Sequence, residues 1–177
     1  MTMKHLWHDI DPGKLGKIKA VVEIPKGSGN KYELDLESGG VMLSRVLHTA
    51  FKYPVNYGFI PRSLANDGDA CDVLIVGEEL YPLTLVELRI IGMLKIKDGK
   101  NKDDKLIGVP LKDPNFNEVK SYGKLPRNFL KEIEHFFTHY KDLEGKKVKV
   151  VGWISARKAL KELRNSLERY NAKYNTE

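Results

Sequence analysis

Alternation of apolar and polar positions is the clearest pattern in the first two-thirds of the chain. Residues 18–24, 31–36 and 41–47 are apolar runs or strict alternations bounded by glycine or proline, which is the pattern of β-strands. Similar segments follow at 72–76, 84–98, 105–110 and 146–153. Many short strands with turn residues between them predict a barrel or a strongly curled sheet.

The alternation also assigns charged residues to strand faces. In the second strand one face is apolar, formed by Tyr32, Leu34 and Leu36. Lys31 and Glu33 share the opposite face. In the third strand the same period places Arg45 on the side of Leu43 and Leu47, so a cation is expected among apolar neighbours.

The last third of the chain changes to a helical period. Residues 126–142 carry apolar side chains at helical spacing, with Pro126 in the first turn and Gly145 after the end. Residues 156–172 show a second apolar stripe behind Ser155, a predicted N-cap. Strands followed by helices indicate an α+β fold. No repeat or linker divides the chain, so residues 1–177 are expected to form a single domain.

Composition restricts the class of protein. The chain is 41% hydrophobic and 31% charged, as expected of a soluble globular protein, and no apolar run approaches the roughly 18 residues of a membrane span. The first residues lack the apolar core of a secretory signal, and the single cysteine excludes an internal disulfide, so a cytoplasmic protein is expected. A net charge of +6 admits polyanionic partners, but a lysine-rich surface would give the same value.

The segment ANDGDACDV places Asp67, Asp69 and Asp72 within six positions. Asp-Gly is a common turn pair, so a solvated turn is one interpretation. The other is a site for a hard cation such as Mg²⁺, which prefers carboxylate oxygens. A calcium EF-hand is excluded, because Cys71 and Asp72 stand where its loop needs an oxygen ligand and a glycine.

Further polar residues occur in segments that otherwise read as strands or helices. Glu23 interrupts an apolar strand, and a second acidic cluster at 98–105 contains Asp98 and Asp103. Each of these residues has an ordinary explanation as a surface or loop charge. Basic and phenolic residues accompany the acids, namely Lys31, Arg45, Tyr53, Tyr57, Tyr140 and Lys141. Together they predict a polar cavity that folding alone does not require.

The pair His135 and His139 has the four-residue spacing of zinc peptidases. It lacks the glutamate of H-E-x-x-H, and the sequence suggests no third ligand. We therefore do not expect a zinc site on this helix.

Four blocks of the sequence stand out, namely VEIPKGSGNKYELDLESG, RVLHTAFKYPVNYGFIP, DGDACDVL and HFFTHYKDLEGKKVKVVGW. In this order they resemble the family I soluble inorganic pyrophosphatases of the small prokaryotic type. The loop DGDACDVL resembles that family's metal-binding loop, D-G-D-P-x-D-V/A-L. The similarity covers roughly residues 18–165, so the fold it implies is a small closed five-stranded OB-like β-barrel, with additional strands and two C-terminal helices outside.

The resemblance implies Mg²⁺-dependent hydrolysis of pyrophosphate to two orthophosphates, by in-line attack of a metal-activated water. Several Mg²⁺ ions per site are implied, with Asp69 as the general base. The implied metal ligands are Asp67, Asp72 and Asp103, assisted by Asp98 and Glu23. The implied phosphate-binding residues are Lys31, Arg45, Tyr57, Lys105, Tyr140 and Lys141, supported by Glu33 and Tyr53. A homo-oligomer, a hexamer in this type, is also implied, with no nucleic-acid or membrane partner.

Two departures from the family pattern stand close to these acids. Ala70 and Cys71 replace the usual proline and hydrophobe, and Gly99 and Lys102 stand where glutamate is common. Both bear on metal affinity and loop rigidity. Two alternatives remain open at this stage, an OB-like nucleic-acid-binding module and a Mg²⁺-dependent hydrolase of another phosphoanhydride. The acids crowd the same segments as the tyrosines and would repel a nucleic-acid backbone.

Overall fold

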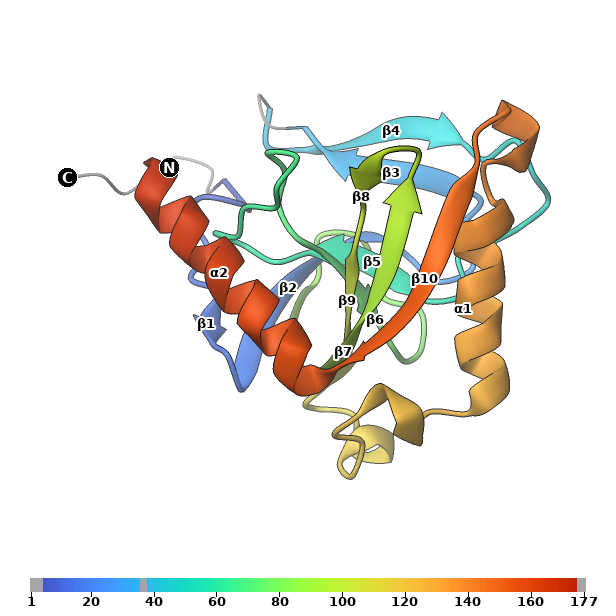
Figure 1. Ribbon diagram of the computed structural model, residues 1–177. Helices are drawn as coiled ribbons and strands as arrows, with labels where there is room; N and C mark the ends of the chain where they lie inside the picture. The colour runs from blue at the N-terminus through green and yellow to red at the C-terminus, as the bar shows by residue number, and fades with distance from the viewer. Residues whose placement is uncertain (1–4, 36–37, 175–177) are drawn as a thin grey trace.

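A closed ring of five strands forms the centre of the computed structural model, which describes residues 5–35 and 38–174 (Figure 1). The ring strands are β2 (Lys17–Ile24), β5 (Asn56–Phe59), β6 (Asp72–Ile75), β9 (Lys105–Pro110) and β7 (Leu85–Asp98). They pair in this order, and β7 pairs back with β2. The pair β6–β9 is parallel, and the other ring pairs are antiparallel. The predicted OB-like barrel is therefore confirmed.

Additional strands extend the barrel. The short strand β1 (Gly13–Lys14) pairs with β2, and β8 (Asn101–Lys102) and β10 (Val148–Ser155) pair with β7. A separate two-stranded ribbon contains β3 (Asn30–Leu34) and β4 (Val41–Val46). Figure 1 shows this ribbon at one end of the barrel, at the top of the view.

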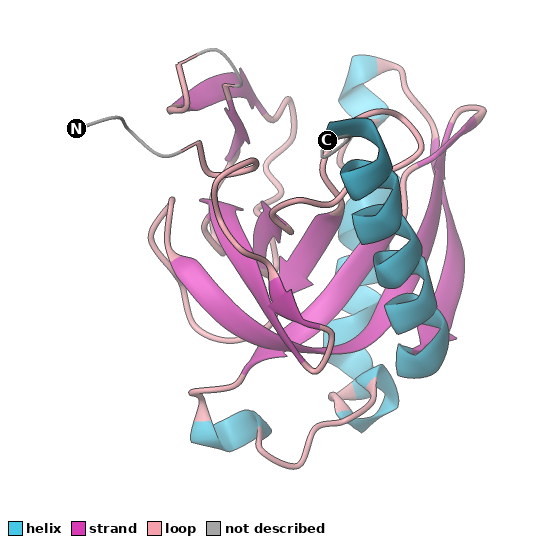
Figure 2. Ribbon diagram, turned by 90° about the vertical axis from the view of Figure 1, so that its left-hand side faces the viewer, coloured by secondary structure: helices cyan, strands magenta, loops and turns pink. Residues whose placement is uncertain are grey.

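Two helices pack outside the barrel, on different sides of it (Figures 1 and 2). Helix α1 (Arg127–His139) buries Ile133, Phe136 and Phe137, and α2 (Ala156–Tyr174) buries Ala159, Leu163, Ser166 and Tyr170. Short 3₁₀ helices are η1 (Pro114–Phe116), η2 (Tyr122–Lys124) and η3 (Asp142–Glu144). In the described part of the chain, neither helix is long and apolar enough to span a membrane.

Alternate positions along the ring strands supply two apolar clusters. On β6, Leu74 joins the cluster that contains the buried residues of α1, whereas Val73 and Ile75 join the cluster that contains Leu163 of α2. Because both faces of these strands are covered, they read in the sequence as continuous apolar runs. The two helices therefore pack against the outside of the ring, and polar residues can line its open end.

Most predicted elements are confirmed within one or two residues, and one ring strand was missed. Strand β5 was not expected, because its four residues are too few to show a period. Gly58 lies at its centre, and a Cβ there would stand 1.9 Å from the carbonyl oxygen of Val21 on β2. The absence of a side chain is what allows these two strands to approach.

Helix α1 is shorter than the predicted 126–142. Pro126 is its N-cap, with ψ of 131°, and the helix ends at His139 with Tyr140 as C-cap. The chain then continues into η3, which Gly145 closes with a φ of +69°. Ser155 caps α2 as predicted, because its Oγ accepts from the Lys158 N–H at 3.5 Å.

The predicted face of Arg45 is wrong. A β-bulge at Ser44 pairs Arg45 with Lys31 and Leu43 with Tyr32, so Arg45 and Leu43 lie on opposite faces of the ribbon. The bulge inserts one residue, which reverses the two-residue alternation beyond it. The predicted strand 31–36 ends at Leu34 in β3. Leu36 lies outside the described residues.

Candidate active site

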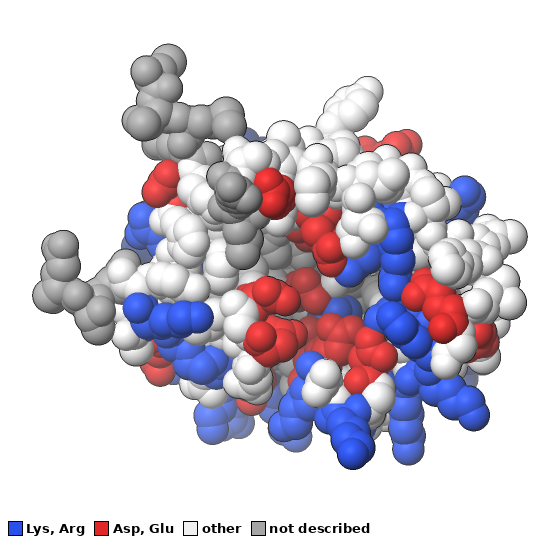
Figure 3. Space-filling view, turned by 90° about the horizontal axis from the view of Figure 1, so that it is seen from above, with Lys and Arg blue, Asp and Glu red and all other residues white. Residues whose placement is uncertain are grey.

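An acidic cavity of about 530 Å³ opens at one end of the barrel. Its walls come from the ring strands, the ribbon strand β3, the loop between β5 and β6, the hairpin β7–β8, the end of α1 and the middle part of α2. Figure 3 shows aspartate and glutamate side chains gathered around this hollow, with lysine and arginine side chains along its edge. The cavity therefore concentrates both signs of charge in one place.

The aspartate loop, residues 65–71, closes on itself through its own backbone. The Ala65 N–H donates to the Asp69 carbonyl at 2.8 Å, and the Asp69 N–H donates to Oδ1 of Asp67 at 3.2 Å. Gly68 adopts a φ of +99°, which a side chain would strain. Burial, together with the nearby carboxylates of Asp67 and Asp72, raises the pKa of Asp69. The tight turn holds two acids that would otherwise separate.

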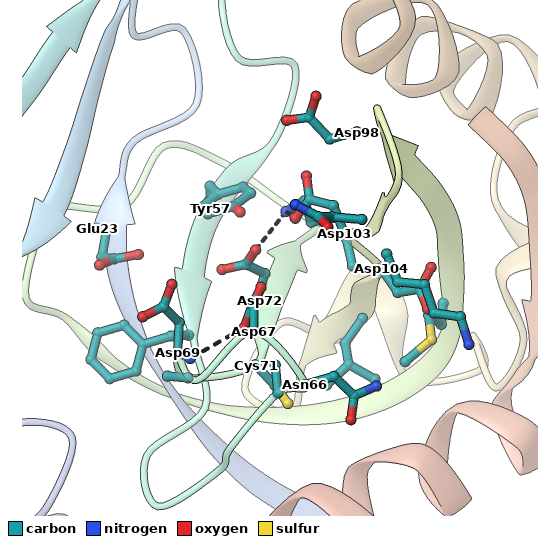
Figure 4. Close-up of a pocket in the computed structure, with 18 of the residues that line it drawn as sticks. Glu23, Tyr57, Asn66, Asp67, Asp69, Cys71, Asp72, Asp98, Asp103 and Asp104 are labelled. Carbon is teal, nitrogen blue, oxygen red and sulfur yellow. Dashed lines mark hydrogen bonds and ion pairs between the residues drawn. The ribbon is translucent and has the colours of Figure 1, made fainter. Parts of the chain in front are cut away.

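The parallel pair β6–β9 brings an acid and a base to the same end of the ring, where Figure 4 shows Asp72 close to Asp103. Val73 pairs with Leu106, so Asp72 and Lys105 stand at the starts of neighbouring strands. The Nζ of the buried Lys105 contacts Oδ2 of Asp72 at 2.5 Å and also pairs with Asp103. Burial alone would lower the pKa of Lys105, but these two carboxylates raise it well above its ordinary range.

The hairpin β7–β8 supplies the second group of acids. Asp98 ends β7, and its Oδ2 accepts from Nζ of Lys141 at 2.5 Å. Burial raises the pKa of Asp103, against the opposing effect of Lys105. Burial would lower the pKa of Lys141, but its hydrogen bond to Asp98 raises it above the ordinary value. A segment beyond α1 is thus connected directly to the acidic hairpin.

Glu23 lies in the cavity wall on β2 and is only 7% exposed. Its Oε1 accepts from the Leu34 N–H at 2.8 Å, which connects the barrel to the ribbon. No described cation forms an ion pair with it. Burial raises the pKa of Glu23 to about 8. A buried carboxyl of this kind is costly unless a cation compensates its charge, so it is a candidate ligand.

The phenols and the ribbon complete the wall. Tyr53, Tyr57 and Tyr140 are buried, and all three line the cavity. Burial raises the pKa values of Tyr53 and Tyr57, so their hydroxyls stay neutral hydrogen-bond donors at neutral pH. On the ribbon, Lys31 pairs with Glu33, and both residues reach the cavity.

Arg45 lies behind the wall and is not among the described residues that line the cavity. Its Nη1 donates to Oε2 of Glu144 at 2.7 Å, and its guanidinium lies 5.8 Å from the Tyr140 ring centre. Among the described residues, Nε and Nη2 of Arg45 have no hydrogen-bond partner. This edge of the guanidinium has the fork geometry that binds a phosphate in a bidentate manner.

Sequence reasoning missed several residues of the cavity. Asp104 accepts from the Ile96 N–H at 3.0 Å and pairs with Lys95, which fixes the base of the acidic hairpin. Only its place beside Asp103 could have indicated it. The other missed lining residues include Trp7, Asn66, Glu162 and Arg169. They come from the N-terminal segment, the aspartate loop and α2, and no local pattern relates them to the acids.

The two histidines of α1 lie away from this cavity. The rings of His135 and His139 are 4.7 Å apart, and neither residue lines the acidic cavity. Across residues 5–35 and 38–174, no three His, Cys, Asp or Glu side chains are arranged to hold a metal ion.

The charge of the cavity explains why its acids do not converge. Among the residues that the structure describes, nine carboxylates line it against five cationic side chains, which leaves −4 when all are ionised. Lys105 lies between Asp72 and Asp103, and Lys141 holds Asp98, so described cations occupy the space between these acids. The oxygen-only donor set and the raised pKa values fit hard divalent cations. A polyanion could bind here only if such ions supplied further positive charge.

Comparisons with known proteins agree with this arrangement. The sequence profile of the family described as inorganic pyrophosphatase matches residues 20–171. The inorganic pyrophosphatase of Aquifex pyrophilus is 45% identical over 170 residues, which is 93% of this chain and 96% of the relative. The inorganic pyrophosphatase of Sulfolobus acidocaldarius is 44% identical over 166 residues, which is 90% of this chain and 96% of the relative. The crystal structure of the inorganic pyrophosphatase from Thermus thermophilus superimposes on this chain with a TM-score of 0.91. The two sequences are 41% identical, and the match covers 95% of this chain and 99% of that one.

Proposed function

The chain belongs to the inorganic pyrophosphatase family, hydrolases that split pyrophosphate into two orthophosphates, and we propose that it carries out this reaction in the acidic cavity with Mg²⁺. The observation that carries the assignment to this cavity is the excess of carboxylates around the buried Lys105. Such a site repels pyrophosphate until divalent cations are bound, so metal dependence follows from the charge itself.

The ligands that we propose for the Mg²⁺ ions are the carboxylates facing the cavity. Asp67, Asp72 and Asp103 are the principal ligands, and Asp98 and Glu23 assist. When bound, the ions polarise phosphoryl oxygens, lower the pKa of water and neutralise the acids. Lys105 and Lys141 would orient these carboxylates before metal binds, because Lys105 forms ion pairs with two of them and Lys141 with one.

Asp69 is the proposed general base. Its carboxylate projects into the cavity from the turn between Asp67 and Asp72, and among the described residues it has no ion-pair partner. Burial and the neighbouring carboxylates raise its pKa, which improves its ability to accept a proton from the attacking water. Asp67 and Asp72 would hold metal, while Asp69 takes the proton.

The proposed substrate-binding residues surround the acids. Lys31, Lys105 and Lys141 face the cavity with their ammonium groups and would stabilise phosphate oxygens, while the neutral hydroxyls of Tyr57 and Tyr140 add orientation. Arg45 would bind a phosphate through Nε and Nη2, which are buried and have no hydrogen-bond partner among the described residues. Glu33 and Tyr53 support Lys31 and the aromatic wall.

Phosphate release from pyrophosphate, measured with Mg²⁺ and again with a chelator, tests the proposal. We expect rapid release with Mg²⁺ and none above background after chelation. Well-folded protein that releases no phosphate in a metal-dependent manner would contradict the proposal. Nucleoside triphosphates in parallel reactions test the alternative of another phosphoanhydride, and salt-dependent binding of single-stranded DNA tests the nucleic-acid alternative.

We further propose a cytoplasmic homohexamer. The single cysteine is consistent with a reducing compartment, and the hexamer follows from the resemblance to the small prokaryotic type. Light scattering should give about 121 kDa, six times the 20.2 kDa of one chain. A mass of one chain at micromolar concentration would contradict the assembly without affecting the proposed reaction.

A further inference from the structure

The aspartate loop is connected to both ends of the chain through a short anchor segment, residues 62–64. This segment lies between β5 and the loop, and all three of its residues make hydrogen bonds to elements outside the ring. It is well buried, with Ser63 fully buried and Leu64 only 8% exposed. The loop beyond it is exposed from Asn66 to Asp69. The position of two proposed functional acids therefore depends on how this segment is held.

Helix α2 binds both backbone polar groups of Leu64. The Leu64 N–H donates to the Ser166 carbonyl at 3.0 Å, and Nε of Arg169 donates to the Leu64 carbonyl at 2.9 Å. A buried backbone carbonyl without a partner is destabilising, so loss of the arginine contact should have a measurable effect. Arg169 also lines the acidic cavity, which places this clamp next to the loop it holds.

The N-terminal segment binds the other two anchor residues. Nε1 of Trp7 donates to the Ser63 carbonyl at 2.8 Å, and the Arg62 N–H donates to the Trp7 carbonyl at 2.9 Å. Arg62 has a φ of +50°, an unfavourable region for a residue with a side chain. Its Nε donates to the His8 carbonyl at 2.8 Å. External contacts thus maintain a conformation that the anchor segment would not prefer by itself.

The far end of the loop is held by the same elements. The Cys71 N–H donates to Oγ of Ser63 at 2.8 Å. The thiol of Cys71 also interacts with the hydroxyls of Ser63 and Ser166, both fully buried. Both ends of the loop therefore meet at the interface with α2. Between them, the described backbone bonds are internal to the loop, from Ala65 to Asp69.

We propose that Arg169 is a positioning residue of the active site, which sets the aspartate loop for metal binding by holding the Leu64 carbonyl. This inference rests on the proposed function of Asp67 as a metal ligand. Arg169 acts through the backbone and not through the metal, so its removal weakens metal binding without removing a ligand. Loss of an outer partner of a metal site lowers metal affinity by about 10-fold or more.

The test compares Arg169→Met, Arg169→Lys and the control Arg164→Met, in the full-length protein. Methionine keeps the apolar stem but cannot donate to the Leu64 carbonyl, whereas lysine can donate once. Arg164 is exposed on the same helix and does not line the cavity. Three quantities are measured: Mn²⁺ binding by electron paramagnetic resonance, amide hydrogen exchange of residues 65–70, and the Mg²⁺ concentration for half-maximal pyrophosphate hydrolysis.

In Arg169→Met we expect about 10-fold weaker Mn²⁺ binding, faster exchange in 65–70, and a correspondingly higher Mg²⁺ requirement. The effect should appear in the Mg²⁺ requirement, because every proposed ligand and Asp69 remain. Arg169→Lys should restore most of the metal affinity, and Arg164→Met should match the parent. A residue that only stabilises the fold would lower the melting temperature without this selective change in metal affinity.

Unchanged Mn²⁺ affinity and unchanged exchange in folded Arg169→Met would overturn the inference. Trp7→Phe provides a second test, because it removes the donor to the Ser63 carbonyl on the other side of the anchor segment, while a smaller ring remains against Tyr170 and Tyr174. Trp7→Phe should also weaken Mn²⁺ binding and speed amide exchange in residues 65–70. A folded Trp7→Phe protein in which neither quantity changes would also count against the inference. A parent protein that binds Mn²⁺ but does not hydrolyse pyrophosphate would defeat the proposed function alone.

Discussion

Binding of Mg²⁺ should release a proton from Glu23 at neutral pH. Burial raises the pKa of this carboxyl from 4.5 to about 8 in the metal-free protein. At pH 7 such a group is about 90% protonated, whereas a carboxylate beside a dication is ionised. Binding of an ion that Glu23 helps to hold should therefore displace about 0.9 proton per chain from this residue.

The same shift makes the stability of the metal-free protein depend on pH. The folded state binds the Glu23 proton more tightly than the unfolded state. The contribution of Glu23 to the free energy of unfolding is therefore largest below pH 4.5. It then decreases as the pH rises and reaches its lower limit above about 8. At 1.36 kcal/mol per pKa unit, the whole effect is roughly 5 kcal/mol. Glu23→Gln should remove most of this slope, because it keeps the shape without titrating.

Isothermal titration calorimetry in buffers of different ionisation enthalpy measures the released protons directly. Chelator-treated protein is titrated with Mg²⁺ at pH 7 and at pH 9, and Glu23→Gln is titrated in parallel. Release should be near 0.9 proton at pH 7, about 0.1 at pH 9, and smaller in Glu23→Gln by the same amount. Equal release by the parent and Glu23→Gln at pH 7 would refute the reasoning, since another group would then be the source.

Three further predictions concern the centre of the cavity. Asp69→Asn should lower turnover by about 10²-fold or more with pyrophosphate affinity largely retained, and near-normal turnover would remove Asp69 from the role of base. Lys105→Met should destabilise the protein by about 3–5 kcal/mol in urea unfolding with chelator present, because two carboxylates lose their buried partner. The exposed Lys149→Met is its control, and equal stabilities would contradict this account. A bulky thiol reagent should lower activity once it labels Cys71, and full activity of demonstrably labelled protein would count against the placement of the thiol beside the loop.

The strands that carry most of the site could be predicted from the sequence, because their apolar faces repeat every two residues. The period located the strands of Glu23, Asp72 and Lys105, and the family motifs brought them together as one site. Neither source could predict the face of Arg45, because one inserted residue at Ser44 reverses the alternation without any change in composition.

The roles of residues that act through tertiary contacts could not be predicted from the sequence. Arg169 reads as one more cation on an amphipathic helix, and only the fold places it against the Leu64 carbonyl. Asp104 reads as one acid among several, although it accepts from the Ile96 N–H and fixes the hairpin. Cys71, a departure from the family pattern, fits between two buried serines that stand far apart in the chain. Such contacts have no periodic signal.

Closure of the barrel between β2 and β7 has a consequence for how the protein folds. The pairing of Ile18 with Leu88 joins distant parts of the chain, and the acids of the cavity come from separate segments of the sequence. Non-local pairings of this kind slow folding, because the loops must be closed before the contacts are gained. The proposed metal ligands lie on ring strands and their connecting loops, so only the native state would bring them together. Divalent cations would then stabilise the protein by mass action, by about 2.7 kcal/mol at a free concentration of 100 times Kd.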